Sequence, residues 1–135
     1  MRRRVAEARV GRLATVTADG EPHLVPVCFA LAGDLIYWTV DQKPKASRDL
    51  KRVRNLAVHP VAELLVDHYE EDWQRIWWVR IDCTADVLEA GPESEHALDL
   101  LSGKYAQYRE RRPAGPVVRL RAHRWSGWSG DGVDA

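Results

Sequence analysis

The stretch from Ile76 to Leu88 reads I-W-W-V-R-I-D-C-T-A-D-V-L and has the clearest pattern in the chain. Alternate positions are apolar, which is typical of a β-strand with one buried face and one face toward water. The residues predicted on the buried face are Trp77, Val79, Ile81, Cys83, Ala85 and Val87, and those predicted on the wet face are Trp78, Arg80, Asp82, Thr84 and Asp86. The chain is therefore predicted to build a sheet whose wet face carries aromatic and charged side chains.

Shorter strands are predicted on both sides of this one, at residues 13–17, 22–30, 35–40, 62–67 and 117–125. Asp19-Gly20 and Gly33-Asp34 are turn sequences, so the strands around them are expected to pair as hairpins. Pro26 lacks a backbone donor, which predicts an edge position or a bulge for its strand. This spacing favours a mainly β fold, a six-stranded antiparallel barrel with flanking helices, over a parallel α/β sheet.

Helical spacing predicts three helices around these strands, at residues 1–12, from Pro44 to His59, and from Pro92 onward. Glu93 and Glu95 fall in the first turn of the last helix, where the helix dipole favours acidic side chains. The sequence shows no internal repeat and no linker. One domain is therefore expected at residues 1–128, followed by a loose tail at 129–135.

Length and composition restrict the class of protein. The chain has 135 residues, 45% hydrophobic and 30% charged, as expected for a soluble globular protein. No apolar run approaches the ~20 residues that span a membrane, and the start M-R-R-R lacks an apolar signal region, so a cytoplasmic location is predicted. Twenty acidic and twenty basic residues argue against a nucleic-acid partner. Cys28 and Cys83 match no zinc or redox spacing and are expected in the core.

The segment from Thr39 to Leu56 gathers positive charge in a chain that is neutral overall. It holds three of the four lysines, and its cations are Lys43, Lys45, Arg48, Lys51, Arg52 and Arg54. A helix that begins near Pro44 would add the unpaired N–H groups of its first turn, so the segment is a candidate phosphate site. The alternative is a solvated helix face with weak ion pairs such as Asp49 with Arg52.

Aromatic residues form a second group, with Trp73, Trp77 and Trp78 at the start of the long strand. Trp77 and Trp78 face opposite sides, so one indole is free to stack on a planar ligand or to fill an interface; core and dimer packing is the alternative. The run D-H-Y-E-E-D at 67–72 matches no metal-site spacing and is interpreted as a hydrated loop, with no metal expected. No nucleophile or nucleotide-binding motif occurs, so any enzymatic activity is expected to depend on a bound cofactor.

Several segments together resemble the split β-barrels of the pyridoxamine-phosphate-oxidase-like class. They are V-G-R-L-A-T-V-T-A-D-G-E-P-H-L-V-P-V (10–27) and D-L-I-Y-W-T-V-D-Q-K-P-K (34–45). Two further segments, R-N-L-A-V-H-P-V-A-E-L-L-V-D-H-Y-E-E-D-W (54–73) and I-W-W-V-R-I-D (76–82), resemble the F420-dependent subgroup, which is found mainly in actinobacteria. The resemblance covers roughly residues 5–128.

The resemblance implies a six-stranded split barrel that forms a homodimer with two cofactor sites at the interface. In that class the flavin or deazaflavin ring lies against the second and third strands, and its phosphate meets basic residues after the third strand. The residues that this implies for cofactor binding are Val25, Pro26, Val27, Thr39, Lys43, Lys45, Lys51, Arg52, Trp78 and Arg80. Trp78 and Arg80 would form a wall of the site, and the catalytic residue is unknown.

The first functional hypothesis is an F420H2-dependent reductase that passes a hydride to an unsaturated small-molecule acceptor. F420 carries an oligoglutamate tail as well as a phosphate, so a cluster of six cations fits it better than FMN. An FMN-dependent oxidase or reductase of the same fold is the second hypothesis. The third is a non-catalytic carrier of a flavin, a deazaflavin or haem. Tyr37, Tyr69 and His68 are considered as proton donors.

Overall fold

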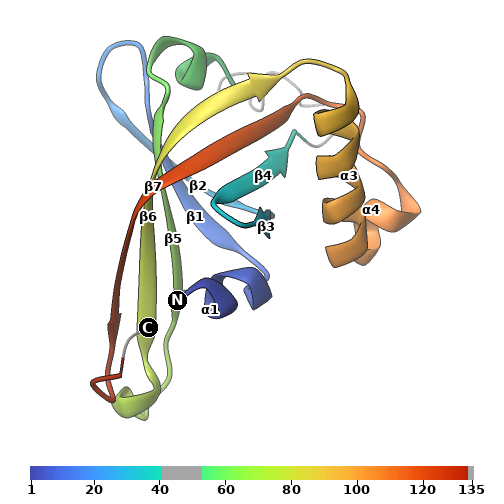
Figure 1. Cartoon of the computed structure of the whole chain (residues 1–135). Coiled ribbons are helices and arrows are strands. Elements are labelled where there is room, and N and C mark those ends of the chain that lie inside the picture. Colours follow the sequence, from blue (N-terminus) through green and yellow to red (C-terminus); the bar gives the residue numbers. More distant parts are fainter. Residues whose placement is uncertain (41–52, 134–135) are drawn as a thin grey trace.

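The computed structural model describes residues 1–40 and 53–133, and its centre is one antiparallel sheet of seven strands (Figure 1). The strand order across the sheet is β2-β1-β5-β6-β7-β4-β3. The strands are β1 (Gly11–Val16), β2 (Pro22–Val27), β3 (Ala30–Ala32), β4 (Leu35–Thr39), β5 (Val61–His68), β6 (Trp77–Leu88) and β7 (Val117–Ser129). The helices are α1 (Arg2–Glu7), the 3-10 helix η1 (Trp73–Arg75), α3 (Pro92–Lys104) and α4 (Ala106–Glu110), and residues 53–58 are also helical.

The mainly β class is confirmed, with seven strands instead of the six predicted. The additional strand arises because the predicted strand at 22–30 is divided into β2 and β3. Phe29 is fully buried at the division, and its N–H donates to the Tyr105 hydroxyl, 3.1 Å away, instead of to a neighbouring strand. The first helix is also shorter than predicted, because β1 already begins at Gly11.

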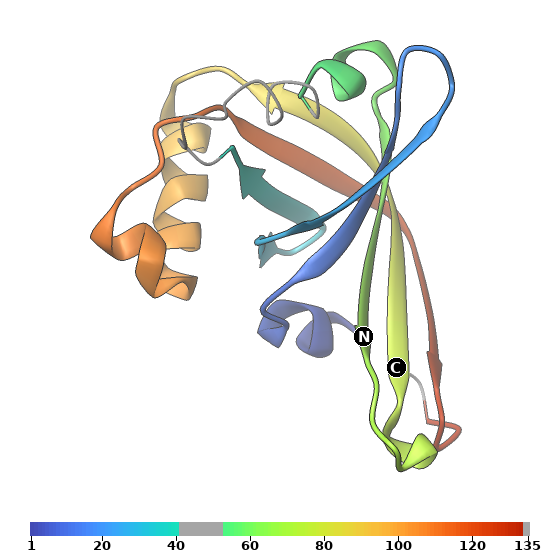
Figure 2. The ribbon, with the colours of Figure 1, turned by 180° about the vertical axis from the view of Figure 1, so that it is seen from behind.

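The long strand predicted from its alternation is β6, and its inward side chains lie in the core. Val79, Ile81, Cys83 and Ala85 are buried, while Val87, near the end of the strand, is exposed, contrary to the prediction. The two longest strands, β6 and β7, change register between Asp82 and Cys83. Figure 2 shows both strands bending over the core toward α3, as a bulge of this kind allows. Burial of the thiol raises the pKa of Cys83 to about 12.

Cys28 corrects the prediction that both cysteines are buried. Val27 and Phe29 on either side of it enter the core, so the thiol between them is exposed. Among the described residues, no helix is long and apolar enough to cross a membrane.

A network of charged groups fixes α3 to the sheet. Glu93, in the first turn of α3, accepts hydrogen bonds from Arg119 of β7 at 2.7 and 2.9 Å and from the Tyr37 hydroxyl at 2.9 Å. Arg119 also donates to Asp86 of β6 at 3.1 Å. The bonds from Arg119 and Tyr37 lower the pKa of Glu93, while burial and the bond to Glu93 raise the pKa of Tyr37 to about 12. Tyr37 is therefore a structural residue, held in its neutral form.

The last strand is longer than the sequence predicts and continues through Ser129. After it, the Gly130 N–H donates to the carbonyl of Ile76 at 2.9 Å, and the Ser129 hydroxyl donates to Asp131 at 2.7 Å. A Cβ at Gly130 would lie 1.9 Å from the Trp73 carbonyl oxygen, so only glycine allows this close approach. The chain after β7 is thereby attached to η1.

Candidate functional site

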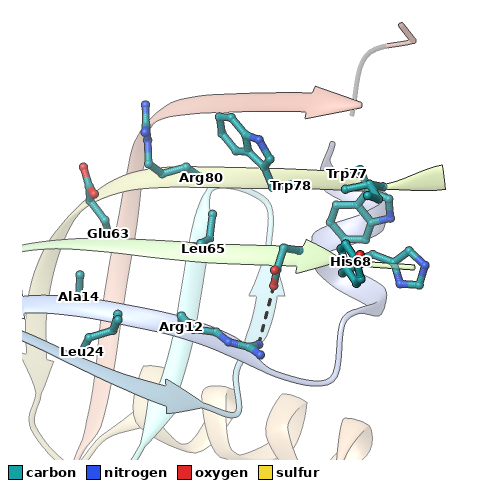
Figure 3. Close-up of a pocket in the computed structure, with 12 residues that line it drawn as sticks. Arg12, Ala14, Leu24, Glu63, Leu65, His68, Trp77, Trp78 and Arg80 are labelled. Carbon is teal, nitrogen blue, oxygen red and sulfur yellow. Dashed lines mark ion pairs between the residues drawn. The ribbon is translucent and has the colours of Figure 1, made fainter. Parts of the chain in front are cut away.

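The outer face of the sheet, opposite the core, carries a groove of about 490 Å³ across β1, β2, β5 and β6 (Figure 3). Strand register builds it: Pro26 pairs with Arg12, Arg12 with Leu65, and Leu65 with Arg80. These four side chains form one row, three strand spacings or about 14 Å long. The lining residues are Arg12, Ala14, Leu24, Glu63, Leu65, Asp67, His68, Tyr69, Ile76, Trp77, Trp78 and Arg80.

Trp78 and Arg80 form the β6 wall of this groove. The Arg80 guanidinium carbon lies 5.7 Å from the centre of the Trp78 ring, within the range of a cation–π contact. Arg80 Nε is buried and has no hydrogen-bond partner among the described residues, and it is 3.9 Å from Asp82 Oδ1. One wall thus carries an aromatic ring next to a cation with a hydrogen-bond donor that has no partner among the described residues. This combination suits a planar ligand with anionic or carbonyl oxygens.

The floor of the groove is apolar, and its ends are polar. Leu65 of β5 and Ala14 of β1 lie between the Trp78 wall and Leu24 of β2 (Figure 3). The Arg12 guanidinium is 3.9 Å from the Asp67 carboxylate across the groove. A few charged groups around an apolar floor are the usual composition of a small-molecule site.

His68 and Trp77 close one end of the groove as a pair of stacked rings. Their ring centres are 6.4 Å apart, with an angle of 23° between the planes. His68 Nε2 lies 3.3 Å from Glu70 Oε1, and Glu70 also forms an ion pair with Arg75 at 2.7 Å, so the acidic loop is paired internally. Among the described residues, no group of three His, Cys, Asp or Glu side chains is placed to hold a metal ion.

The residues predicted on the second strand separate into two groups. The side chains of Val25 and Val27 face the core, while Pro26 faces outward in the same row as Arg80. β2 is at one end of the strand order and pairs only with β1, so its outer backbone edge has no strand partner among the described elements. Backbone contact of β2 with a ring remains compatible with this placement and stays a prediction.

The remaining predicted residues do not join the groove. Thr39, at the end of β4, is buried and donates its hydroxyl to the Pro116 carbonyl at 3.0 Å. Four strands lie between β2 and β4 in the strand order, and Thr39 is not among the residues lining the groove. The predicted phosphate-binding cations Lys43, Lys45, Lys51 and Arg52 lie outside the described residues. Of the predicted set, the structure places Trp78 and Arg80 in the groove; Pro26 lies in the same row of the sheet as Arg80 but is not among the residues that line the groove.

Several residues of the groove were not predicted from the sequence, chiefly Arg12, Leu24, Leu65 and Asp67. The signal available was the alternation of the segments 11–16, 22–27 and 61–68, which places these side chains on a wet face. Alternation does not say which strands are neighbours, so it could not place Arg12 beside Leu65.

Tyr105 and Lys104 hold the chain just after β2. The Tyr105 hydroxyl accepts from the Phe29 N–H, and Lys104 Nζ donates to the Phe29 carbonyl at 2.8 Å. The Lys104 ammonium also lies 4.1 Å from the centre of the Phe29 ring. Burial, followed by the nearby charge of Arg9, lowers the pKa of Lys104 to about 8 from its ordinary 10.5.

Lys104 is expected to make the stability of the protein rise with pH between about 8 and 10.5, because the unfolded chain holds its proton up to the higher value. The effect is isolated by the difference between the wild-type protein and Lys104→Met. Urea unfolding at pH 7.5 and pH 10.5 should show the wild type gaining free energy of unfolding relative to the variant. If the wild type and Lys104→Met differ by the same free energy of unfolding at both pH values, burial does not lower the pKa of the Lys104 amine.

The strand order, the curved sheet and the outer groove define the chain as a split β-barrel protein. Over residues 1–129 the sequence matches the pyridoxamine 5'-phosphate oxidase family, and the chain belongs to that family. None of the curated proteins matches the sequence.

Solved structures share this fold. A conserved hypothetical protein from Mycobacterium tuberculosis is 20% identical, with a TM-score of 0.76 covering 93% of this chain and 80% of that chain. A FAD-binding protein from Mesorhizobium loti is 21% identical, with a TM-score of 0.71 and coverages of 93% and 89%. The heme-storage protein HutZ from Vibrio cholerae is 16% identical, with a TM-score of 0.73 and coverages of 95% and 90%. At these identities the likeness concerns the fold alone.

Proposed function

We propose that this protein is an F420-dependent oxidoreductase that binds its coenzyme in the outer groove, at an interface between two copies of the chain. The observation that carries the proposal is the pairing of Trp78 and Arg80 over the apolar floor made by Leu65. An indole stacks on a planar ring, and an unpaired guanidinium N–H donates to a ring or phosphate oxygen. These groups fit the ring end of a flavin or deazaflavin.

The choice of a second copy as the partner rests on exposed apolar residues beside the groove. Leu24 is 66% exposed, Leu65 37% and Trp128 48%, and Trp128 lies directly opposite Trp78. Large apolar side chains grouped on one face are typical of an interface. A two-fold dimer would bury the same face of each copy, which is the commonest assembly of soluble proteins. Each groove would then be roofed by the partner.

F420 is proposed rather than FMN because of the basic segment between Thr39 and Leu56, whose six cations exceed what one phosphate requires. The alternative with FMN, as oxidase or reductase, keeps the same groove, and the FAD-binding protein of the same fold supports a flavin. A non-catalytic carrier is the other candidate, because the heme-storage protein HutZ has this fold.

Reduced F420, when bound, supplies a hydride from C5 of its ring. The chain's own residues position the reacting molecules: Trp78 would fix the plane of the ring, and Arg80 would orient its polar edge. Leu65 and Leu24, covered by the partner, would keep water from the reacting face. Positioning and exclusion of water are the contributions that a protein makes to cofactor chemistry.

Separate titrations with F420 and FMN, followed by ligand fluorescence, test the proposal. We expect saturable binding with a preference for F420. A preference for FMN would make FMN the proposed coenzyme instead of F420. Binding of neither molecule would contradict both cofactor hypotheses. Binding of F420 without turnover of any acceptor would support the carrier.

Two substitutions in the groove wall are expected to weaken coenzyme binding. Arg80→Met keeps the aliphatic stem but removes the charge and donors, and Trp78→Leu removes the stacking surface. Each should raise the dissociation constant about tenfold, equivalent to about 1.4 kcal/mol.

The matched controls are Arg3→Met and Trp73→Leu, because both side chains are exposed and lie outside the groove. Fluorescence titration should show a raised dissociation constant in Arg80→Met and Trp78→Leu and the wild-type dissociation constant in the two controls. Wild-type affinity in Arg80→Met and Trp78→Leu would place the coenzyme elsewhere.

A further inference from the structure

A smaller cavity, of about 310 Å³, lies at the end of the sheet where η1 joins β5 to β6, and its walls come from α1, this hairpin and the turn after β7. Trp77, in its wall, packs against the core, whereas the next residue of β6, Trp78, faces the outer groove. Figures 1 and 2 show α1 beside these strands. The stacked rings of His68 and Trp77 border both spaces, but the Trp78–Arg80 wall belongs to the outer groove alone.

Arg4 of α1 brings a positive charge into this cavity without a partner for it. The Arg4 guanidinium carbon lies 5.1 Å from the centre of the Trp77 ring, and Arg4 Nη1 is buried with no hydrogen-bond partner. No hydrogen bond or ion pair joins the Arg4 side chain to any other residue that the structure describes. The ring orients the guanidinium but accepts no ordinary hydrogen bond from Nε and Nη2, so their donors are available to a ligand.

The first of the two acids that line the cavity, Glu70, already has partners of its own. Glu70 Oε1 lies 2.7 Å from Arg75 Nε and 3.3 Å from His68 Nε2. The charge of Arg75 is therefore compensated within the loop, and Glu70 is not the counter-ion of Arg4.

The second acid, Asp131, is likewise held by other groups. Its Oδ1 accepts from the Ser129 hydroxyl at 2.7 Å and from the Val133 N–H at 2.9 Å. These two bonds, and more weakly the charge of Arg4, lower the pKa of Asp131. Asp131 is thus an ionised neighbour of Arg4 that makes no ion pair with it, which leaves room for an anion on the guanidinium.

The charges around the cavity limit that anion to a single negative charge. Two arginines and two carboxylates line it, and only Arg4 lacks a carboxylate partner. A carboxylate matches the planar fork of an arginine and carries one charge. A phosphate monoester would place a second negative charge near Glu70 and Asp131, where like charges repel.

We propose that this cavity binds a small molecule that carries one carboxylate, with Arg4 as its main binding residue. The carboxylate oxygens would accept from Arg4, and the apolar part of the molecule would lie against Trp77. The site needs no coenzyme, so the inference goes beyond the proposed function and is independent of it.

Benzoate is the probe for this site, and benzamide is its uncharged analogue of nearly the same shape. In ¹⁵N-labelled protein, the indole signal of Trp77, assigned by its loss in Trp77→Leu, should shift saturably with benzoate. The same signal should show no saturable shift with benzamide, and the Trp78 signal should move less than that of Trp77. Absence of saturable benzoate binding would overturn the proposal, and so would binding that shifts Trp78 and leaves Trp77 unchanged.

Arg4→Met keeps the aliphatic stem on Trp77 but removes the charge and the donors. It should raise the dissociation constant of benzoate by about 10- to 100-fold. Arg4→Lys keeps the charge without the planar fork, so its dissociation constant should fall between those of Arg4→Met and the wild type. The matched control is Arg3→Met, the preceding residue of α1, which is exposed, pairs with Glu7 and does not line the cavity.

Far-UV circular dichroism checks that each variant is folded, and Arg3→Met should bind benzoate as the wild type does. Wild-type affinity for benzoate in folded Arg4→Met and Arg4→Lys would overturn the role of Arg4. Phenyl phosphate, which is mostly a dianion at pH 7.5, should bind more weakly than benzoate. Tighter binding of phenyl phosphate would overturn the assignment to a singly charged carboxylate.

Discussion

Leu65→Lys is expected to convert the proposed dimer into a monomer while the fold is retained. Leu65 is at the centre of the outer face, between Arg12 and Arg80 in the strand register. A lysine there would lie between the two arginines in the strand register, Arg12 and Arg80, and two-fold symmetry would place one such lysine in each copy. Burying both lysines in the interface should raise the dissociation constant of the dimer by a factor on the order of 10²–10³.

Sedimentation velocity at several protein concentrations measures this effect, and far-UV circular dichroism checks the fold. Val58→Lys is the matched control, because Val58 is exposed on the helical segment 53–58 and is absent from the outer groove. Val58→Lys should sediment as the wild type does. A Leu65→Lys protein with wild-type sedimentation would contradict the proposed dimer interface on this face.

Phe29→Ala is expected to lower the free energy of unfolding by about 3–5 kcal/mol, the range for losing a fully buried aromatic ring. Phe29 is 0% exposed, and its ring fills the space beside Gly11, where an added Cβ would lie 3.3 Å from it. The cavity forms at the junction between β2 and β3, so β2, the edge strand beside the groove, should become the most mobile part of the sheet.

Urea unfolding followed by tryptophan fluorescence measures the loss. It is done at one fixed protein concentration, because the proposed dimerisation would contribute to stability. Phe29→Leu, which retains most of the apolar volume, should lose much less than Phe29→Ala. Hydrogen exchange should become faster in residues 22–27 of the alanine variant. An unfolding midpoint unchanged from the wild type would show that Phe29 does not anchor this junction.

The parts of the fold that could be predicted from the sequence are those with local periodicity. β6 was predicted almost in full, because its inward residues from Val79 to Ala85 alternate with polar ones. The turn at Gly20, where φ is 83°, was recognised from its Asp-Gly sequence. In each case the signal lies within a few neighbouring residues.

The features that could not be predicted depend on residues far apart in the chain. The division between β2 and β3 depends on Tyr105, which is 76 residues from Phe29 and takes its N–H. The same division places Cys28 outside the core. The register change after Asp82, which bends β6 and β7, depends on how those two strands pair. No local pattern in residues 22–30 reports these contacts.

The candidate site shows the same limit. Trp78 and Arg80 were predicted because they belong to one alternating strand, and the structure places both in the groove. Arg12 and Leu65 come from other strands, and only the order β1-β5-β6 brings them to that wall.

The most direct test of the outer-face coenzyme site uses the indole N–H signals of the six tryptophans. In ¹⁵N-labelled protein titrated with F420, the Trp78 signal, assigned by its loss in Trp78→Leu, should shift in proportion to coenzyme bound. The signal of Trp38, buried in the core, should move least. Saturable binding of F420 with the Trp78 signal unchanged would contradict a coenzyme site in this groove.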